Sequence, residues 1–287
     1  MTGFTVSPAQ ATADWGQVTE WADAEGWNVG RGDADAFLPT DPGGFLLGRL
    51  DGRTVSAVSV VNYSPRYAFL GHYITEPALR GKGFGYATWQ AALAHAGGRT
   101  VGLDAVPAQV GNYRASGFEP LYGNARYTGR PHRPATTLTE SALPGTAPLS
   151  PDHLDALTAY DQGYFPAERG AFLRRWLTGP GRVTHVRERG SRITGYGSLR
   201  PSTLGFRLGP LFAETPEDAE SLLDALLAHL GPDDEVALDI PDPNGAAAAL
   251  ATARGLTPGF RTTRMYAGPP PATPTGRAWA VTTLELG

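Results

Sequence analysis

The fold of this chain is best read from one short stretch, which runs Tyr73-Ile74-Thr75-Glu76-Pro77-Ala78-Leu79-Arg80-Gly81-Lys82-Gly83-Phe84-Gly85. An apolar, strand-like segment leads into a glycine-rich turn, and a helical pattern begins directly after the turn. The first N–H groups of a helix are unpaired and carry the positive end of its dipole, so they bind phosphate well. Glycines let a phosphate approach the backbone, and Arg80 and Lys82 add positive charge. The stretch therefore predicts a pyrophosphate site between a strand and a helix.

Hydrophobic patterns on both sides of this turn predict an α/β fold. Apolar residues at helical spacing, Trp15, Val18 and Ala22, indicate a first helix. The pair Asp51-Gly52 lies between two apolar runs, which is typical of a β-hairpin turn. The remaining expected elements are strands at residues 45–50, 55–61, 68–75 and 101–105, a helix at about 84–95, a short helix before Gly117, and a last strand at 278–284.

The second half of the chain repeats features of the first half in the same order. Gly71 matches Gly209 and Asp104 matches Asp239, and the spacing between matched residues is nearly constant. Several ordered matches at one spacing indicate two tandem copies of an α/β unit. A residue repeated in both copies more often serves the fold than the chemistry, so Asp104 is expected to be structural. A segment rich in Pro, Thr, Ser and Ala separates the copies. We therefore expect a first domain at residues 1–130, a linker at 131–149 and a second domain at 150–287.

Composition excludes several classes of function. The 287-residue chain contains no cysteine, which rules out disulfides, thiolate zinc sites and a cysteine nucleophile. Its six histidines are scattered without metal-ligand spacing, so we expect no metal. The net charge of -4 and the pI of about 5.9 give no basic surface for nucleic acid. No apolar run is long enough to span a membrane and no signal peptide is recognisable, so we expect a cytoplasmic protein.

At the phosphate turn and around it, the chain resembles the GNAT (Gcn5-related N-acetyltransferase) superfamily. The family signature for the acyl-CoA pyrophosphate is Gln/Arg-x-x-Gly-x-Gly/Ala, and residues 80–85 fit it fully. Residues 74–77 resemble the family's Val-x-Pro strand end with one residue added, and residues 113–118 resemble its Tyr-x-x-x-Gly-Phe segment. The resemblance covers about residues 15–127, and the second half resembles a divergent GNAT-like domain. It implies two tandem domains, each with a central mixed, mostly antiparallel sheet flanked by helices.

The resemblance also implies roles for individual residues, with acetyl-CoA as co-substrate. The backbone of Tyr73 and Ile74 would pair with the pantetheine arm, and the N–H near Ile74 would stabilise the thioester oxyanion. Tyr113 would protonate the departing thiolate, although it could instead be a packing residue beside Phe118. The residues expected to bind acyl-CoA are Tyr73, Ile74, Arg80, Gly81, Lys82, Gly83, Phe84 and Gly85.

The acceptor side of the site is less defined by the sequence. Glu25, Trp27 and Asn28 lie in the segment that the family uses for acceptor specificity, although Trp27 could equally cover the core. His72 is either a general base or a core residue on the same strand face as Ile74. The general base therefore stays unassigned. Because no cysteine is available, the acceptor is expected to attack the thioester directly.

The second half lacks the phosphate signature at the matching helix start. Thr215 and Pro216 suit the first positions of a helix, and Asp218 could complete a capping box there. Acidic side chains at this start would repel a pyrophosphate, so we do not expect the second half to bind CoA in the usual way. It could still line the acceptor pocket at the domain interface. The polar candidates for that role are Asp161, Tyr164 and Arg169.

Taken together, these features predict transfer of an acetyl group from acetyl-CoA to a primary amine of a small molecule. The alternative is a non-catalytic CoA-binding sensor or regulator. A weaker third reading is a phosphate-binding fold for another ligand such as a nucleotide. The sequence defines neither the acceptor nor the oligomeric state.

Overall fold

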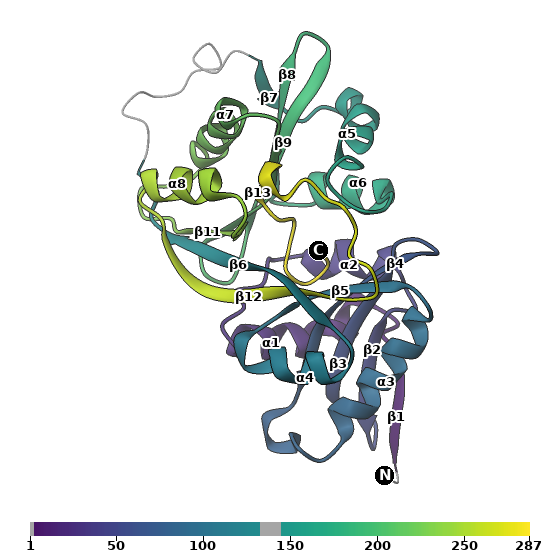
Figure 1. The fold of residues 1–287 in the computed structure, drawn as a ribbon. Coiled ribbons are helices and arrows are strands. Elements are labelled where there is room, and N and C mark those ends of the chain that lie inside the picture. Colours follow the sequence, from purple (N-terminus) through teal and green to yellow (C-terminus); the bar gives the residue numbers. More distant parts are fainter. Residues whose placement is uncertain (1–2, 133–144) are drawn as a thin grey trace.

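The structure is a computed structural model that describes residues 3–132 and 145–287, and it consists of two α/β halves (Figure 1). The strands of the first half are β1 (Phe4–Pro8), β2 (Phe45–Leu50), β3 (Arg53–Asn62), β4 (Tyr67–Thr75), β5 (Thr100–Ala105) and β6 (Glu119–Gly129). Its helices are α1 (Gly16–Ala24), α2 (Asp33–Phe37), α3 (Phe84–Ala96) and α4 (Val110–Ala115).

The second half repeats this arrangement with additional elements. Its strands are β7 (Thr146–Pro148), β8 (Val183–Arg189), β9 (Arg192–Pro201), β10 (Phe206–Ala213), β11 (Val236–Pro241), β12 (Thr257–Ala267) and β13 (Ala278–Ala280). Its helices are α5 (Leu154–Asp161), α6 (Gly170–Thr178), α7 (Pro216–Leu227) and α8 (Gly245–Ala253). None of the helices in the described ranges is long and apolar enough to cross a membrane.

Each predicted element of the first half is present, and most of the apolar residues that predicted these elements are buried. Trp15, Val18 and Ala22 are buried on the inner side of η1 (Thr12–Trp15) and α1. The turn between β2 and β3 has φ values of 50° at Asp51 and 84° at Gly52, as a two-residue hairpin turn with positive φ at both positions requires.

Two expectations outside these elements need correction. The predicted last strand at 278–284 ends at Ala280, and the Val281 N–H then donates to the Asp239 carbonyl oxygen of β11 at 2.9 Å. A short strand, β7, pairs with β8 inside the predicted linker. The rest of that linker, residues 133–144, lies outside the described residues.

All thirteen strands of the described residues belong to one sheet, because the two halves exchange their last long strand. The strand order is β1-β2-β3-β4-β5-β12-β6-β11-β10-β9-β8-β7, with β13 paired to β10. Strand β12 of the second half therefore lies between β5 and β6, and β6 of the first half lies between β12 and β11. In Figure 1 these two long strands cross the middle of the molecule. The sheet is mixed and mostly antiparallel, with parallel pairs at β4–β5 and β10–β11.

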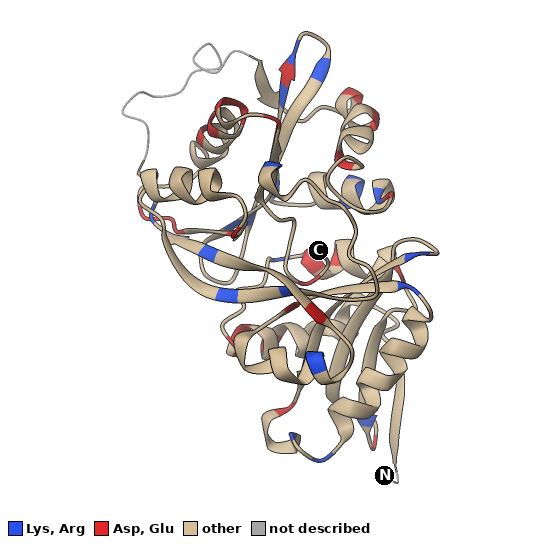
Figure 2. Ribbon diagram, in the orientation of Figure 1, with Lys and Arg blue, Asp and Glu red and all other residues tan. Residues whose placement is uncertain are grey.

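Reciprocal buried ion pairs accompany this exchange. Asp104 on β5 accepts from Arg264 of β12 at 2.7 Å, and Asp239 on β11 accepts from Arg126 of β6 at 2.7 Å. Each matched aspartate thus binds the arginine that the other half supplies, and Figure 2 shows basic residues along both crossing strands. A buried carboxylate is costly unless it is paired, so these contacts support the structural role predicted for Asp104.

Helices cover both faces of the first half. On one face, Trp89 and Ala92 of α3 pack against Val58 and Val60 of β3. On the other face, Trp15 and its neighbours in α1 join a core that continues into α6 of the second half. This shared core and the continuous sheet hold the two halves together.

The sheet opens in the middle of each half, where the parallel pairs end. Strands β4 and β5 pair only from Tyr67 to Leu70 on β4, and β10 and β11 pair only from Phe206 to Leu208 on β10. In the second half, β13 enters the opening and pairs with Leu211 and Phe212 of β10. In the first half, the corresponding edge of β4 faces a groove.

The last residues of the chain, 281–287, are buried between the halves. A Cβ atom at Gly71 would lie 2.1 Å from the Glu285 carbonyl oxygen, and one at Gly209 would lie 2.4 Å from the Val281 carbonyl oxygen. The matched glycines are therefore needed because the same tail backbone passes against both strands.

Candidate active site

The phosphate turn connects β4 to α3 in a conformation that depends on its glycines. Gly81 and Gly83 have φ values of 75° and 89°, which a residue with a side chain rarely adopts. A Cβ atom at Gly85 would lie 2.4 Å from the Thr75 Oγ1, so the helix start approaches the strand end closely. Gly83 is the N-cap of α3 and has no side chain, so it leaves the first helical N–H groups available to an anion.

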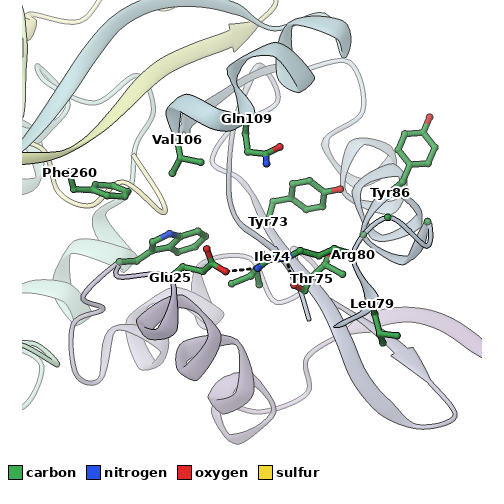
Figure 3. Close-up of a pocket in the computed structure, with 14 residues that line it drawn as sticks. Glu25, Tyr73, Ile74, Thr75, Leu79, Arg80, Tyr86, Val106, Gln109 and Phe260 are labelled. Carbon is green, nitrogen blue, oxygen red and sulfur yellow. Dashed lines mark hydrogen bonds and ion pairs between the residues drawn. The ribbon is translucent and has the colours of Figure 1, made fainter. Parts of the chain in front are cut away.

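A groove with a volume of about 680 Å³ runs along the end of β4 and the start of α3 (Figure 3). This size suits an extended ligand rather than a single small group. The residues that line the groove are Glu25, Trp27, Tyr73, Ile74, Thr75, Leu79, Arg80, Gly81, Gly83, Gly85, Tyr86, Val106, Gln109 and Phe260.

The structure places the charged residues of the turn in different settings. Arg80 forms an ion pair with Glu25 across the groove, and its Nε donates to the Thr75 carbonyl oxygen at 3.1 Å (Figure 3). Lys82 is exposed beside the groove and is not among its lining residues. Phe84 is buried against Phe4, with ring centroids 5.1 Å apart, so only its backbone can contribute to an anion site.

The edge of β4 facing the groove is the part predicted to pair with a pantetheine arm. Ile74 pairs with Ala57 of β3 on its other side, whereas β5 has already diverged. The corresponding stretch of β10 pairs with β13, with Leu211 opposite Ala280. In the second half the chain's own strand thus occupies the position where an extended ligand would pair in the first half.

A smaller cavity of about 70 Å³ adjoins the groove and lies between the two halves. Trp27, Tyr73, Val106, Gln109 and Phe260 line both, so the groove and the cavity are contiguous. The other lining residues of the cavity are Leu70, Gly71, His72, Leu103, Asp104, Tyr113, Arg126, Thr262, Leu284 and Glu285.

Tyr113 lies at the junction of this cavity with the core. Its ring packs 5.4 Å from Trp89 and 6.1 Å from Phe118, so the packing contact and the cavity position occur together. Burial raises the pKa of Tyr113 well above its ordinary value, and the nearby Tyr73 adds to this effect. The phenol therefore stays protonated near neutral pH and can act as a proton donor.

His72 lines the cavity from an irregular position in β4, where its φ is 48°. Its Nδ1 is 2.9 Å from the Ser59 Oγ, and its ring packs edge-on against Trp15 and Phe37. Burial lowers the pKa of His72, while the charge of Glu285 acts in the opposite direction. The imidazole is thus neutral near pH 7, as either of its two predicted roles permits.

Asn28 lies away from both hollows. Its side chain donates to the Leu204 carbonyl oxygen at 3.2 Å and accepts from the Leu204 N–H at 2.8 Å, so it connects the two halves. Glu25 and Trp27 line the groove, and of the two only Trp27 also lines the cavity. The two hydrogen bonds to Leu204 favour a structural role for Asn28.

The polar candidates of the second half also lie elsewhere. Asp161 and Arg169 form a buried bidentate ion pair, and Tyr164 shares a hydrogen bond of 2.6 Å with Tyr160. None of the three predicted residues is among those lining the acceptor-side cavity. Asp161 and Arg169 instead join the end of α5 to the residue before α6 as a buried pair.

The start of α7 differs from the start of α3 in its cap, as predicted, but two arginines offset the Asp218 charge that was expected to repel a pyrophosphate. The Thr215 Oγ1 accepts from the Asp218 N–H at 3.2 Å, and Pro216 is the first helical residue. The expected capping box is not completed by the Asp218 side chain, which is buried and bound by Arg187 and Arg189. This helix start is thus satisfied by its own side chains.

Sequence reasoning missed several residues that form the cavity. Arg126, Phe260 and Glu285 come from the crossing strands and the C-terminal tail, and nothing near them in the sequence resembles a site motif. Arg126 carries one available signal, because it matches Arg264 at the spacing of the repeat.

Comparisons with known proteins agree with this geometry. Residues 14–118 match the Acetyltransferase (GNAT) family, and residues 157–280 match an Acetyltransferase (GNAT) domain. The chain is 34% identical over 284 residues to the holothin acyltransferase of Pseudoalteromonas sp. (strain SANK 73390), covering 99% of this chain and 95% of the relative.

Solved structures share the fold. A putative acetyltransferase from Pyrococcus horikoshii superposes with a TM-score of 0.82 at 21% identity, covering 100% of this chain and 97% of that one. A tandem GNAT protein from the clavulanic acid biosynthesis pathway superposes with a TM-score of 0.61 at 20% identity, covering 93% and 99% of the two chains.

Proposed function

Because the chain belongs to the GNAT family of acetyltransferases, we propose that it transfers an acetyl group from acetyl-CoA to the primary amine of a small molecule. The observation that carries this proposal is the meeting of two hollows. A long groove suited to acyl-CoA joins a smaller cavity at Trp27 and Tyr73, so a thioester in the groove would face an acceptor in the cavity.

The residues of the groove fit acyl-CoA. Backbone N–H groups from Gly81 to Gly85 would hold the pyrophosphate, with the charges of Arg80 and Lys82 nearby. Arg80 would have to share or exchange its contact with Glu25, because the two are paired across the groove. The free edge of β4 at Tyr73 would pair with the pantetheine arm.

The reaction would then be a direct acyl transfer. The amine nitrogen attacks the thioester carbonyl carbon, and a β4 N–H near Ile74 would stabilise the oxyanion that forms. The C–S bond breaks, and Tyr113 gives its proton to the leaving thiolate. The position of Tyr113 supports this role, because it lines the cavity that adjoins the groove.

The acceptor is proposed to be a small molecule rather than a protein. The cavity lies between the halves and is much smaller than the groove, about 70 against 680 Å³. The relative that is 34% identical is named for acylating holothin, which supports a small acceptor and makes holothin the first compound to test.

Calorimetry with acetyl-CoA tests the proposal first. We expect binding at one site per chain, since β13 fills the opening of the second half. Binding should be lost in an Arg80→Ala/Lys82→Ala variant. Release of CoA thiol with holothin or other primary amines then tests transfer. Binding without any turnover would favour a sensor, and absence of binding would refute the proposal.

A further inference from the structure

The cavity beside the groove is built from segments that are far apart in the sequence. His72 and Asp104 come from β4 and β5, Phe260 comes from β12, and Glu285 comes from the C-terminal tail. The second half therefore contributes directly to a hollow that opens into the groove of the first half. Its charged groups decide what kind of acceptor can enter.

Most charges at the cavity are already neutralised by partners. Arg264 donates to both carboxylate oxygens of Asp104, at 3.0 and 2.7 Å, and Asn124 donates to it at 2.8 Å. Arg126 donates to both carboxylate oxygens of Asp239 at 2.7 and 3.1 Å. Bidentate contacts of this kind are strong, so neither group is free to bind a ligand charge.

Glu285 differs from these groups. Its carboxylate accepts a hydrogen bond from the Thr283 hydroxyl, and its nearest cation is Arg207 at 3.6 Å. That distance exceeds an ordinary charge-assisted hydrogen bond, and Arg207 is already bound to Asp239. Glu285 is only 6% exposed. Of the two carboxylates that line the cavity, Glu285 therefore has the longer contact with a cation, and a buried carboxylate gains from a cationic partner.

The position of Glu285 is fixed by the backbone. Its carbonyl group packs directly against Gly71, and the next residue of β4 is His72. The charge of Glu285 acts on His72, whose pKa it raises against the effect of burial. Because the cavity also contacts Tyr113, a group held at Glu285 lies within the same hollow as the proposed proton donor.

We propose that Glu285 binds the acceptor amine as its ammonium ion and takes the proton that must leave before attack. This inference rests on the proposed function. Glu285 receives one proton, and the neutral amine then attacks the thioester. The amide nitrogen loses a second proton, which replaces the one that Tyr113 gave to the thiolate. Glu285 returns its proton to solvent, so one proton is released for each amide and thiol formed.

The size of the cavity limits the acceptor. The cavity is about a tenth of the size of the groove that it joins, about 70 against 680 Å³. The amine end of an acceptor can enter the cavity while the remainder of a larger acceptor lies toward the groove. We therefore infer that the substrate class is primary amines.

Two small nucleophiles of similar size but different charge test whether Glu285 acts on a protonated amine. Ethylamine is almost fully protonated at about pH 7.5, whereas hydroxylamine is mostly neutral. In Glu285→Gln, we expect kcat/KM for ethylamine to fall by about 100-fold, as for loss of a proton acceptor, and that for hydroxylamine by less than about threefold. Acetyl-CoA binding should be unchanged. Glu235→Gln is the control, because Glu235 is an exposed residue of the second half.

Other outcomes would overturn the inference. Equal losses with both nucleophiles would mean that Glu285 only supports the structure, and no loss would mean that it takes no part. If Glu285→Gln does not fold, Glu285→Asp can replace it, because aspartate keeps the charge on a shorter side chain. We expect this variant to keep its preference for ethylamine over hydroxylamine even where kcat/KM for both compounds falls. A wild-type protein that binds acetyl-CoA but acetylates neither compound would refute the cavity as an amine site. Failure to bind acetyl-CoA would instead refute the proposed function, and this inference with it.

Discussion

Replacing Gly71 by alanine tests how the C-terminal tail is seated. The new Cβ atom would lie 2.1 Å from the Glu285 carbonyl oxygen and 2.9 Å from its carbonyl carbon, both backbone atoms. Ordinary contact begins at 3.4 Å, so the tail has to move by about 1.3 Å. Overpacking a tight site in this way costs about 1–3 kcal/mol.

Because the clash is with backbone, we expect a free energy of unfolding about 2 kcal/mol lower, toward the middle of that range. For a chain of this size such a loss corresponds to a melting temperature lower by roughly 4–8 °C. Glu285 moves with the tail, so kcat/KM for ethylamine should fall while acetyl-CoA affinity is kept. Thermal unfolding, calorimetry and thiol release measure the three quantities.

Gly245→Ala provides the matched control. Gly245 is the first residue of α8, and a Cβ atom there would meet nothing within 4 Å. Alanine favours a helix over glycine by about 0.8–1 kcal/mol in helix interiors, so this change should be neutral or mildly stabilising. If Gly71→Ala and Gly245→Ala have the same melting temperature and the same kcat/KM, the tail does not pass against β4 and the reasoning is refuted.

Three further predictions concern the proposed proton donor Tyr113, the pair of His185 and His229, and the Asp104–Arg264 ion pair. Tyr113→Phe should lower kcat about 100-fold with unchanged acetyl-CoA affinity by calorimetry; a rate within twofold would exclude it as the acid. Burial, with the charge of His229, lowers the pKa of His185 to about 4 from 6.5. The folded state therefore prefers the neutral ring, and the urea midpoint should fall as the pH drops from 6.5 towards 4, less so in His185→Phe; an equal fall in the variant would contradict this. Asp104→Asn and Arg264→Gln should each lower the free energy of unfolding by about 3–5 kcal/mol, and the double variant should lower it by less than the sum of the two. Additive losses would show that the two side chains are not coupled.

The phosphate turn could be predicted because its information is local. The glycine positions, the strand before them and the helix after them follow from patterns within thirteen residues, and the structure has Gly81 and Gly83 at positive φ. The hairpin at Asp51-Gly52 was predictable for the same reason. In both cases the neighbours along the chain are also the neighbours in space.

The strand exchange could not be predicted, because the repeat makes both pairings look alike. Arg126 and Arg264 occupy matching positions, and so do Asp104 and Asp239. An exchanged and an unexchanged arrangement would satisfy the same charges with the same residue types. Only the full set of contacts between the halves decides between them.

The role of the tail was hidden by a misleading local pattern. Residues 278–284 read as a strand, yet pairing stops at Ala280 because the chain leaves β10 and enters the space between the halves. Glu285 directly follows that segment, so its approach to Gly71 depends on a path set by packing. A single sequence carries no signal for such a contact.

The exchange of β6 and β12 gives one chain the topology of a swapped dimer that has become covalently joined. A gene fragment encoding residues 1–130 would leave the edge of β5 without β12, an exposed edge that invites aggregation. The second half fills its own opening with β13, yet it also supplies β12 to the strands of the first half. Deleting the second half would therefore remove a strand from the half that carries the phosphate turn.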